Sequence, residues 1–154
     1  MRAWRIVRAP YLPAAFSGEG ARLFGGRWNL VGVPVVYCSG SLALAALEIL
    51  VHAGRESLPR DYRAVPVDIP ETMEIERIEP TALPKDWRAY PAPLRLQALG
   101  ERWVRAARTA VLRVPSAVIP EESNLLLNPA HPDFAGLRIG DPRPFSFDLR
   151  LTRP

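Results

Sequence analysis

The chain has 154 residues, of which 48% are hydrophobic and 23% charged, and this balance excludes a disordered tail or linker protein. The length suits one domain, residues 1–154, and is too short for two comfortable ones. The formal charge is +4, but acids alternate with the basic residues and no block of like charges indicates a nucleic-acid-binding face.

Seventeen prolines divide the sequence into short elements, because each fixes φ and removes a backbone donor. The first predicted strands are residues 3–7 (AWRIV) and 34–39 (PVVYCS). Residues 41–54 (SLALAALEILVHAG) predict a helix, with Ser41 as the cap at its start and Gly54 at its end.

The second half of the sequence also predicts several strands and one helix. Strands are predicted at 64–69 and 73–78, and a proline-broken loop at 81–93. Residues 94–109 predict an amphipathic helix whose apolar side carries Leu96, Leu99, Trp103 and Val104 or Ala107. The last predicted strands are 110–120, 124–129 and 145–151. Strands outnumber helices without strict alternation, so we expect an α+β fold with a mixed, mainly antiparallel central sheet.

Glu48 is the most unusual residue of the first predicted helix. That helix is apolar nearly all round, which predicts that it is buried and that Glu48 lies in or beside the interior. An ionised carboxylate there is costly unless it is paired or faces a cleft, which favours a functional role. His52 lies one helical turn further on, and we expect it to form an i,i+4 pair with Glu48 at the helix end.

Arg27 stands in the glycine-rich stretch LFGGRWNLVG, residues 23–32. Glycine is used where the backbone takes φ > 0 or where another group approaches closely. From these residues alone, the stretch is either a tight turn that carries a charge or a site at which Arg27 binds a ligand.

Four further polar residues are weaker candidates when each is taken alone. Tyr37 ends a strand, where a cleft commonly opens, although a tyrosine in a strand more often packs in the core. Ser116, in VPSAVIP, can simply end a strand. Asn124 and Asn128 bracket an apolar strand, and Asn128, like His131 after it, suits a loop.

Several common sites have no motif in this sequence. It lacks GxGxxG after a strand, GxxxxGK[ST] and HExxH, which leaves a Rossmann nucleotide site, a P-loop and a zincin unsupported. The single cysteine, Cys38, excludes an internal disulfide and a multi-cysteine zinc site. The first residues contain no apolar signal region, and no stretch approaches about 18 apolar residues, so we expect a cytoplasmic protein without a membrane partner.

Two stretches together resemble a known family. The first is GGRWN followed by PVVY and SLALAALEILVH, and the second is VPSAVIPEESNLLLNPAHPDF. In this order they resemble the RES family, named for an arginine, a glutamate and a serine, whose members are toxins of bacterial toxin–antitoxin pairs. The resemblance runs from WRIVRA to PFSFDLRL, and by position its name-giving residues are Arg27, Glu48 and Ser116.

The resemblance implies an ADP-ribosyltransferase-like fold and an enzyme that consumes NAD as its substrate, with no metal. Such an enzyme cleaves the nicotinamide–ribose bond, and the acceptor is water, phosphate or a protein side chain, which the sequence leaves open. Glu48 would then stabilise the oxocarbenium-like transition state. Arg27 would bind the diphosphate through its planar fork.

The remaining roles also come from the resemblance. Tyr37 would stack on the nicotinamide ring, and Ser116 would donate a hydrogen bond to ribose or phosphate. His52 and Asn124 stand where the family often has polar residues near the nucleotide. The implied partner is an Xre-type helix-turn-helix antitoxin, which would place a carboxylate at Arg27 and through which any contact with DNA would be indirect.

A second hypothesis follows from the sequence pI of about 9.8. A non-catalytic nucleic-acid-binding module could use the many arginines for phosphate contacts. Such modules carry clustered basic residues with interleaved exposed aromatic residues, which this sequence lacks. The NAD-consuming toxin is therefore the favoured interpretation.

Overall fold

A computed structural model describes residues 1–52 and 61–151. The strands are β1 (Arg2–Arg8), β2 (Val36–Ser39), β3 (Tyr62–Asp68), β4 (Ile75–Arg77), β5 (Val111–Pro115), β6 (Ser123–Leu127), β7 (Arg138–Ile139) and β8 (Arg143–Phe145). The α-helices are α1 (Glu19–Phe24), α2 (Leu42–His52) and α3 (Leu94–Ala106), and short 3-10 helices occupy Ala9–Ala14, Pro80–Ala82, Pro132–Gly136 and Leu149–Leu151.

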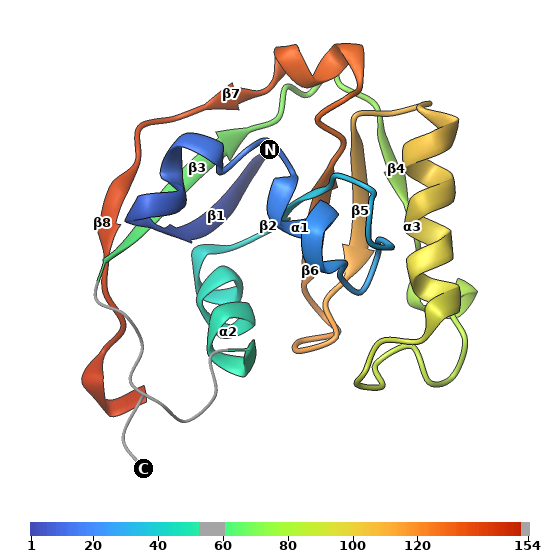
Figure 1. Cartoon of the computed structure of the whole chain (residues 1–154), viewed down its shortest axis with the longest axis horizontal. Coiled ribbons are helices and arrows are strands. Elements are labelled where there is room, and N and C mark those ends of the chain that lie inside the picture. The colour runs from blue at the N-terminus through green and yellow to red at the C-terminus, as the bar shows by residue number, and fades with distance from the viewer. Residues whose placement is uncertain (53–60, 152–154) are drawn as a thin grey trace.

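These strands form one curled sheet in the order β4-β5-β6-β2-β1-β3-β7, and β8 also pairs with β3 (Figure 1). The pair β4–β5 is parallel, and the other pairs are antiparallel. The predicted α+β class with a mixed, mainly antiparallel sheet is confirmed.

Side chains alternate between the two faces of this sheet, as the strand geometry requires. Cys38 pairs with Leu125 on one face, and Tyr37 pairs with Leu126 on the other. The first face carries a core that includes Val36, Val67, Val111 and Leu127. The second face carries two cores, one under α3 that includes Trp28, Leu96 and Trp103, and one under α2 that includes Ile6 and Ala45.

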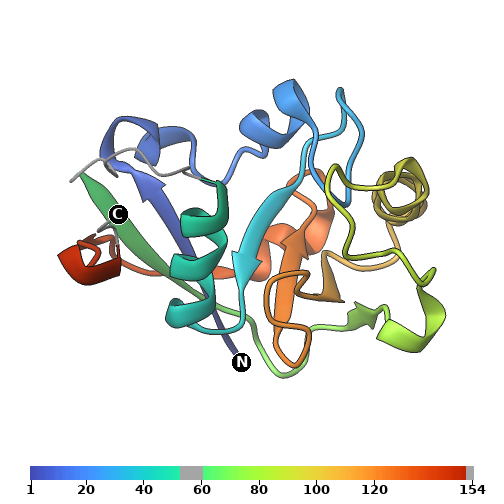
Figure 2. The same cartoon turned by 90° about the horizontal axis from the view of Figure 1, so that it is seen from below.

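The helices α2 and α3 thus cover different parts of the same face. Figure 2 shows α2 beside β2 and α3 further along the sheet, beyond β6. Tyr37 of β2 and Asn124 of β6 point to this face, because Tyr37 pairs with Leu126, and Ser39, two residues on, pairs with Asn124. Tyr37 and Asn124, two of the polar residues predicted from the sequence, therefore lie on the sheet surface between the two helices.

The start of α2 is fixed by Ser41. Its hydroxyl oxygen accepts a hydrogen bond from the Leu44 N–H (3.1 Å), which confirms the predicted cap, and it donates to Oε2 of Glu122 (2.7 Å). The second contact ties α2 to the turn before β6. The predicted cap at the other end, Gly54, lies outside the described residues.

The predicted burial of α2 is wrong. Of its side chains only Leu44 and Ala45 are buried, and Val51 is 55% exposed. The helix packs on β1 and β2 with one side, and its other side faces outward despite its apolar residues. The apolar pattern does not indicate how many layers cover a helix, and α2 has the sheet on one side only. Glu48 is accordingly half-buried, at the edge of the core.

Other predictions differ from the structure as well, and the predicted strand 110–120 ends at Pro115. The helix α1 was not expected, because its six residues, EGARLF, are too few to show a helical period. The predicted strand at 145–151 is wrong beyond Phe145. Asp148 accepts a hydrogen bond from the Arg150 N–H (2.9 Å), and this local turn replaces the alternating strand pattern with a 3-10 helix.

Gly100 of α3 is required by the approach of the turn that follows Arg27. A Cβ at this position would lie 1.8 Å from the Trp28 carbonyl oxygen. We expect Gly100→Ala to lower the free energy of unfolding by about 3 kcal/mol, although alanine gains about 1 kcal/mol of helix propensity. Urea unfolding measures this change.

The matched control is Gly20→Ala in α1, where a Cβ meets nothing within 4 Å. That variant should be as stable as the wild type or slightly more stable. Equal stability of the two variants would mean that α3 does not pack on this turn as described.

Candidate active site

Glu48 is held by two hydrogen bonds that come from different parts of the sheet. Its Oε1 accepts from the Ser116 hydroxyl (2.8 Å) and from Nδ2 of Asn124 (2.6 Å). Ser116 follows β5, Asn124 lies in β6, and Glu48 comes from α2. The fold thus joins three predicted residues that are up to 76 positions apart, and it fixes the orientation of the carboxylate.

The Ser116 hydroxyl is fully used by these contacts. It donates to Glu48, and it accepts from the N–H groups of Val118 and Ile119, both at 3.0 Å. The residue is 0% exposed. A hydroxyl has one proton and two lone pairs, so Ser116 anchors Glu48 to the turn after β5. The predicted direct contact of Ser116 with ribose or phosphate would require that this hydroxyl release Glu48, and it stays a prediction.

Asn124 is itself oriented by a residue that the sequence analysis missed. Its Oδ1 accepts a hydrogen bond from the buried Ser39 hydroxyl (2.8 Å), which leaves the Nδ2 group directed at Glu48. Ser39 lies two residues after Tyr37 on β2, so both point to the same face. The spacing of two residues from Tyr37 on a strand was the signal in the sequence that could have identified Ser39.

Arg27 lies close enough for its charge to interact with that of Glu48. Burial lowers the pKa of the Arg27 guanidinium, and the charge of Glu48 opposes this lowering. Nη1 donates to the carbonyl oxygens of Trp87 (2.7 Å) and Ala89 (3.0 Å). The loop at 81–93, for which the sequence indicated no role, therefore positions this arginine. Within the described chain, Nε and Nη2 have no hydrogen bond, which leaves one edge of the fork for a ligand.

Tyr37 stabilises the turn that carries Arg27. Its hydroxyl accepts from the Trp28 N–H (3.0 Å) and donates to Oδ1 of Asn29 (2.7 Å), and burial raises its pKa. Asn29 is 0% exposed, and its Nδ2 donates to the carbonyl oxygens of Ala21, Leu30 and Val33. The sequence analysis missed Asn29, which shares its short motif with Arg27. Stacking of Tyr37 on a nicotinamide ring stays a prediction.

The glycines before Arg27 serve this turn directly. Gly25 has φ +70°, in the left-handed region that favours glycine. A Cβ on Gly26 would lie 2.5 Å from the Tyr37 hydroxyl and 2.8 Å from Oδ1 of Asn29. The turn and a ligand-binding role of Arg27 are therefore compatible, because the glycines allow the packing that presents the arginine.

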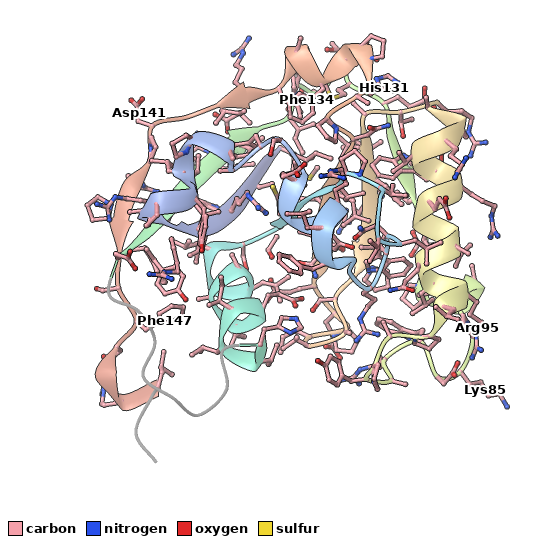
Figure 3. All side chains as sticks on the ribbon, in the orientation of Figure 1. Lys85, Arg95, His131, Phe134, Asp141 and Phe147 are labelled. Carbon is pink, nitrogen blue, oxygen red and sulfur yellow. The ribbon has the colours of Figure 1, made fainter. Side chains whose placement is uncertain are left out.

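His52 is not part of the cluster. It is exposed at the end of α2, and no hydrogen bond or ion pair within the described chain joins it to Glu48, so the expected pair does not form in this structure. Asn128 and His131 are loop residues as expected. Asn128 accepts from the Ala130 N–H (3.1 Å). His131 accepts from the Asp133 N–H (3.1 Å) and lies far from α2 (Figure 3).

The remaining residues add two observations on chemistry. Burial raises the pKa of the Cys38 thiol to about 12, which agrees with the expectation that it is no thiolate nucleophile. Residues 1–52 and 61–151 contain no group of three or more His, Cys, Asp or Glu side chains placed to hold a metal ion. None of the helices in the same ranges is long and apolar enough to span a membrane.

A known protein family matches almost the whole sequence. The sequence matches the RES domain over residues 2–148. The chain belongs to the RES domain family. The resemblance noted in the sequence is therefore confirmed.

Two curated RES relatives are similar over most of their length. One, from Sphingobium sp. (strain YBL2), is named "Prs ADP-ribosylating toxin" and is 42% identical over 97% of this chain and 96% of its own. Another, from Photorhabdus laumondii, is named "Toxin Res" and is 40% identical over 87% of this chain and 85% of its own.

A solved structure shares the RES fold described above. It is the M. tuberculosis MbcT-MbcA toxin-antitoxin complex, with a TM-score of 0.75 and 22% identity, and the match covers 94% of this chain and 84% of the other. The likeness supports the α+β architecture.

Proposed function

We propose that this chain is a toxin that cleaves the bond between nicotinamide and ribose in NAD. The observation that carries this proposal is the carboxylate of Glu48, held by Ser116 and Asn124 within reach of the charge of Arg27, whose fork keeps one free edge. Three of these four, Arg27, Glu48 and Ser116, are the residues that the sequence resemblance assigned to the name-giving RES positions, and it placed Asn124 near them. The two curated relatives described above are both named toxins, which supports the proposal that this chain is a toxin.

The chemistry needs a fixed negative charge near the sugar. When the C–N bond breaks, its electron pair goes to the positively charged pyridinium ring, which leaves as neutral nicotinamide. The ribose then carries positive charge, which a carboxylate stabilises without moving, as in glycoside hydrolysis. Glu48 fits this role because its Oε1 is held by two donors, whereas its other oxygen, Oε2, accepts no hydrogen bond from residues 1–52 and 61–151 and is available for the ribose.

Arg27 would hold the other half of the substrate. Its free edge, Nε and Nη2, can form paired hydrogen bonds with a diphosphate. The carbonyl oxygens of Trp87 and Ala89 keep the guanidinium in place before the ligand arrives. Binding through the diphosphate would place the nicotinamide riboside part of NAD near Glu48.

We propose a protein as the acceptor of the ADP-ribose. The 42% identical relative is named for ADP-ribosylation of Prs, and its similarity extends over 97% of this chain. In that reaction a side-chain nucleophile attacks the ribose carbon, loses its proton to solvent and keeps the ADP-ribose. Water and phosphate attack the same carbon and are the competing acceptors.

Control by an antitoxin belongs to the same proposal. A protein that consumes NAD in the cytoplasm needs a restraint, and an Xre-type antitoxin would supply it. The fold neighbour with 22% identity was solved as a toxin-antitoxin complex. An inhibitor segment with a carboxylate would compete with the diphosphate for the free edge of Arg27. Co-expression of the adjacent gene should then abolish growth arrest.

The nucleic-acid-binding alternative is not favoured by the charge distribution. In the part of the chain that the structure describes, seven arginines pair with carboxylates: Arg2, Arg8, Arg22, Arg95, Arg105, Arg108 and Arg150. These pairs are spread along the chain from β1 to the last 3-10 helix. Arginines that are paired with carboxylates and dispersed along the chain do not form the kind of basic patch that binds a phosphate backbone.

The acceptor is tested by incubating the purified chain with NAD and purified Prs. We expect free nicotinamide by chromatography and, by mass spectrometry, a Prs mass increase equal to one ADP-ribose. Parallel reactions with and without phosphate separate the three acceptors. If nicotinamide is released while Prs stays unmodified, the acceptor is water or phosphate and not Prs. That result would overturn the protein acceptor but not the proposed cleavage of NAD.

A further inference from the structure

The charges of the candidate site do not match those of its proposed ligand. Arg27 and Glu48 are opposite unit charges, so together they contribute no net charge. The diphosphate of NAD carries two negative charges. A dianion bound beside a carboxylate is stabilised when a second cation lies nearby.

The loop segment 87–89 brings a second arginine to this position. The carbonyl oxygens of Trp87 and Ala89 accept from Arg27, and Nε of the residue between them, Arg88, donates to the Ala117 carbonyl oxygen (3.0 Å). Ala117 directly follows Ser116, which holds Glu48. The segment 87–89 therefore contacts both halves of the site, the Arg27 turn through the carbonyl oxygens of Trp87 and Ala89 and the turn after β5 through the Arg88 side chain.

The segment is anchored while the Arg88 side chain remains accessible. Trp87 is only 8% exposed and packs in the core under α3, whereas Arg88 is exposed. Within the described chain, its Nη1 and Nη2 groups make no hydrogen bond and no ion pair. One nitrogen thus orients the guanidinium and two remain free for an anion.

The other cations near this loop are placed differently. Figure 3 shows Lys85 and Arg95 pointing outward at the far corner of the molecule, and Arg95 is paired with Asp86. Arg113 pairs with Leu125 across the strands, so it points to the opposite face of the sheet from Asn124. Among the described cations of this region, Arg88 is the one that lies between the two residues that hold Arg27 and that also donates to the residue after Ser116.

We propose that Arg88 is a second phosphate-binding arginine, which binds the diphosphate of the substrate together with Arg27. The inference rests on the proposed function, because it takes the ligand to be NAD. It assigns to the loop at 81–93 a binding role in addition to its positioning of Arg27.

The test compares Arg88→Ala with Lys85→Ala, which removes the same charge from the same loop at an outward-pointing position. We expect Arg88→Ala to raise the KM for NAD about tenfold or more, with little change in kcat, because a ground-state contact is lost. Calorimetry with ADP-ribose as the probe should show a similar loss of affinity. Arg88→Lys should recover part of it, and Lys85→Ala should match the wild type.

The salt dependence of ADP-ribose binding distinguishes a charge contact of Arg88 from a merely structural role of this residue. Removing a phosphate-binding cation should make the ADP-ribose dissociation constant of Arg88→Ala less sensitive to ionic strength than that of the wild type. Unchanged KM and ADP-ribose affinity would overturn the proposal, as would a fall in kcat alone. If the wild type binds ADP-ribose but releases no nicotinamide, the proposed function fails and the Arg88 assignment is still decided by binding. If the wild type does not bind ADP-ribose, the assignment fails as well.

Discussion

Replacing Glu48 with glutamine should lower the rate of nicotinamide release by about a thousandfold. Glutamine keeps the size of the side chain and an oxygen that can accept from Ser116 and Asn124. It removes the negative charge, and that charge is needed most when the ribose becomes cationic in the transition state. The loss should therefore appear in kcat, measured at saturating NAD.

Binding provides the control for this variant. Because the diphosphate is held elsewhere, the affinity of Glu48→Gln for ADP-ribose should remain within a few-fold of that of the wild type. Ser116→Ala, which removes only one of the two donors to the carboxylate, should reduce kcat less. Wild-type turnover by Glu48→Gln would remove Glu48 from the mechanism.

Replacing Arg27 with alanine should weaken binding and turnover together. Two charge-assisted hydrogen bonds to a diphosphate contribute about 3 kcal/mol, which corresponds to about a hundredfold in affinity. A substrate that is poorly held is also poorly aligned with Glu48, so kcat should fall as well. Steady-state kinetics with NAD and calorimetry with ADP-ribose measure the two effects.

Arg27→Lys is the matched control for the paired hydrogen bonds of the Arg27 guanidinium group. Lysine keeps the charge but offers a single ammonium group, so it should recover only part of the affinity. In cells, Arg27→Ala should be non-toxic and should bind the antitoxin more weakly. Antitoxin binding equal to that of the wild type would show that the inhibitor occupies another part of the molecule.

The sequence predicted the sheet and two of its helices because their signals are local. The apolar period of residues 94–109 marked α3, and Ser41 marked the start of α2. Segment 145–151 has an equally clear alternation, but beyond Phe145 the Asp148 carboxylate accepts from the Arg150 N–H and the chain forms a 3-10 helix over Leu149–Leu151. Local patterns fail where a side chain competes for the backbone.

The sequence predicted which residues belong to the candidate site, but it did not predict the hydrogen bonds that join them. Glu48 was singled out on the expectation of a buried helix, which is wrong, yet it is held by polar partners as a carboxylate at the edge of a core requires. The contact of Ser116 with Glu48 spans 68 positions, which no spacing rule reveals. Backbone acceptors such as the Trp87 carbonyl have no signature in the sequence at all.

The most direct test of the account follows NAD itself during incubation with the purified chain. Proton NMR resolves free nicotinamide from the nicotinamide of NAD, so one time course reports cleavage of the bond regardless of the acceptor. The account predicts steady release of free nicotinamide by the wild type and release about a thousandfold slower by Glu48→Gln. Intact NAD at high protein concentration, together with nucleic-acid binding that weakens steeply with salt, would contradict it.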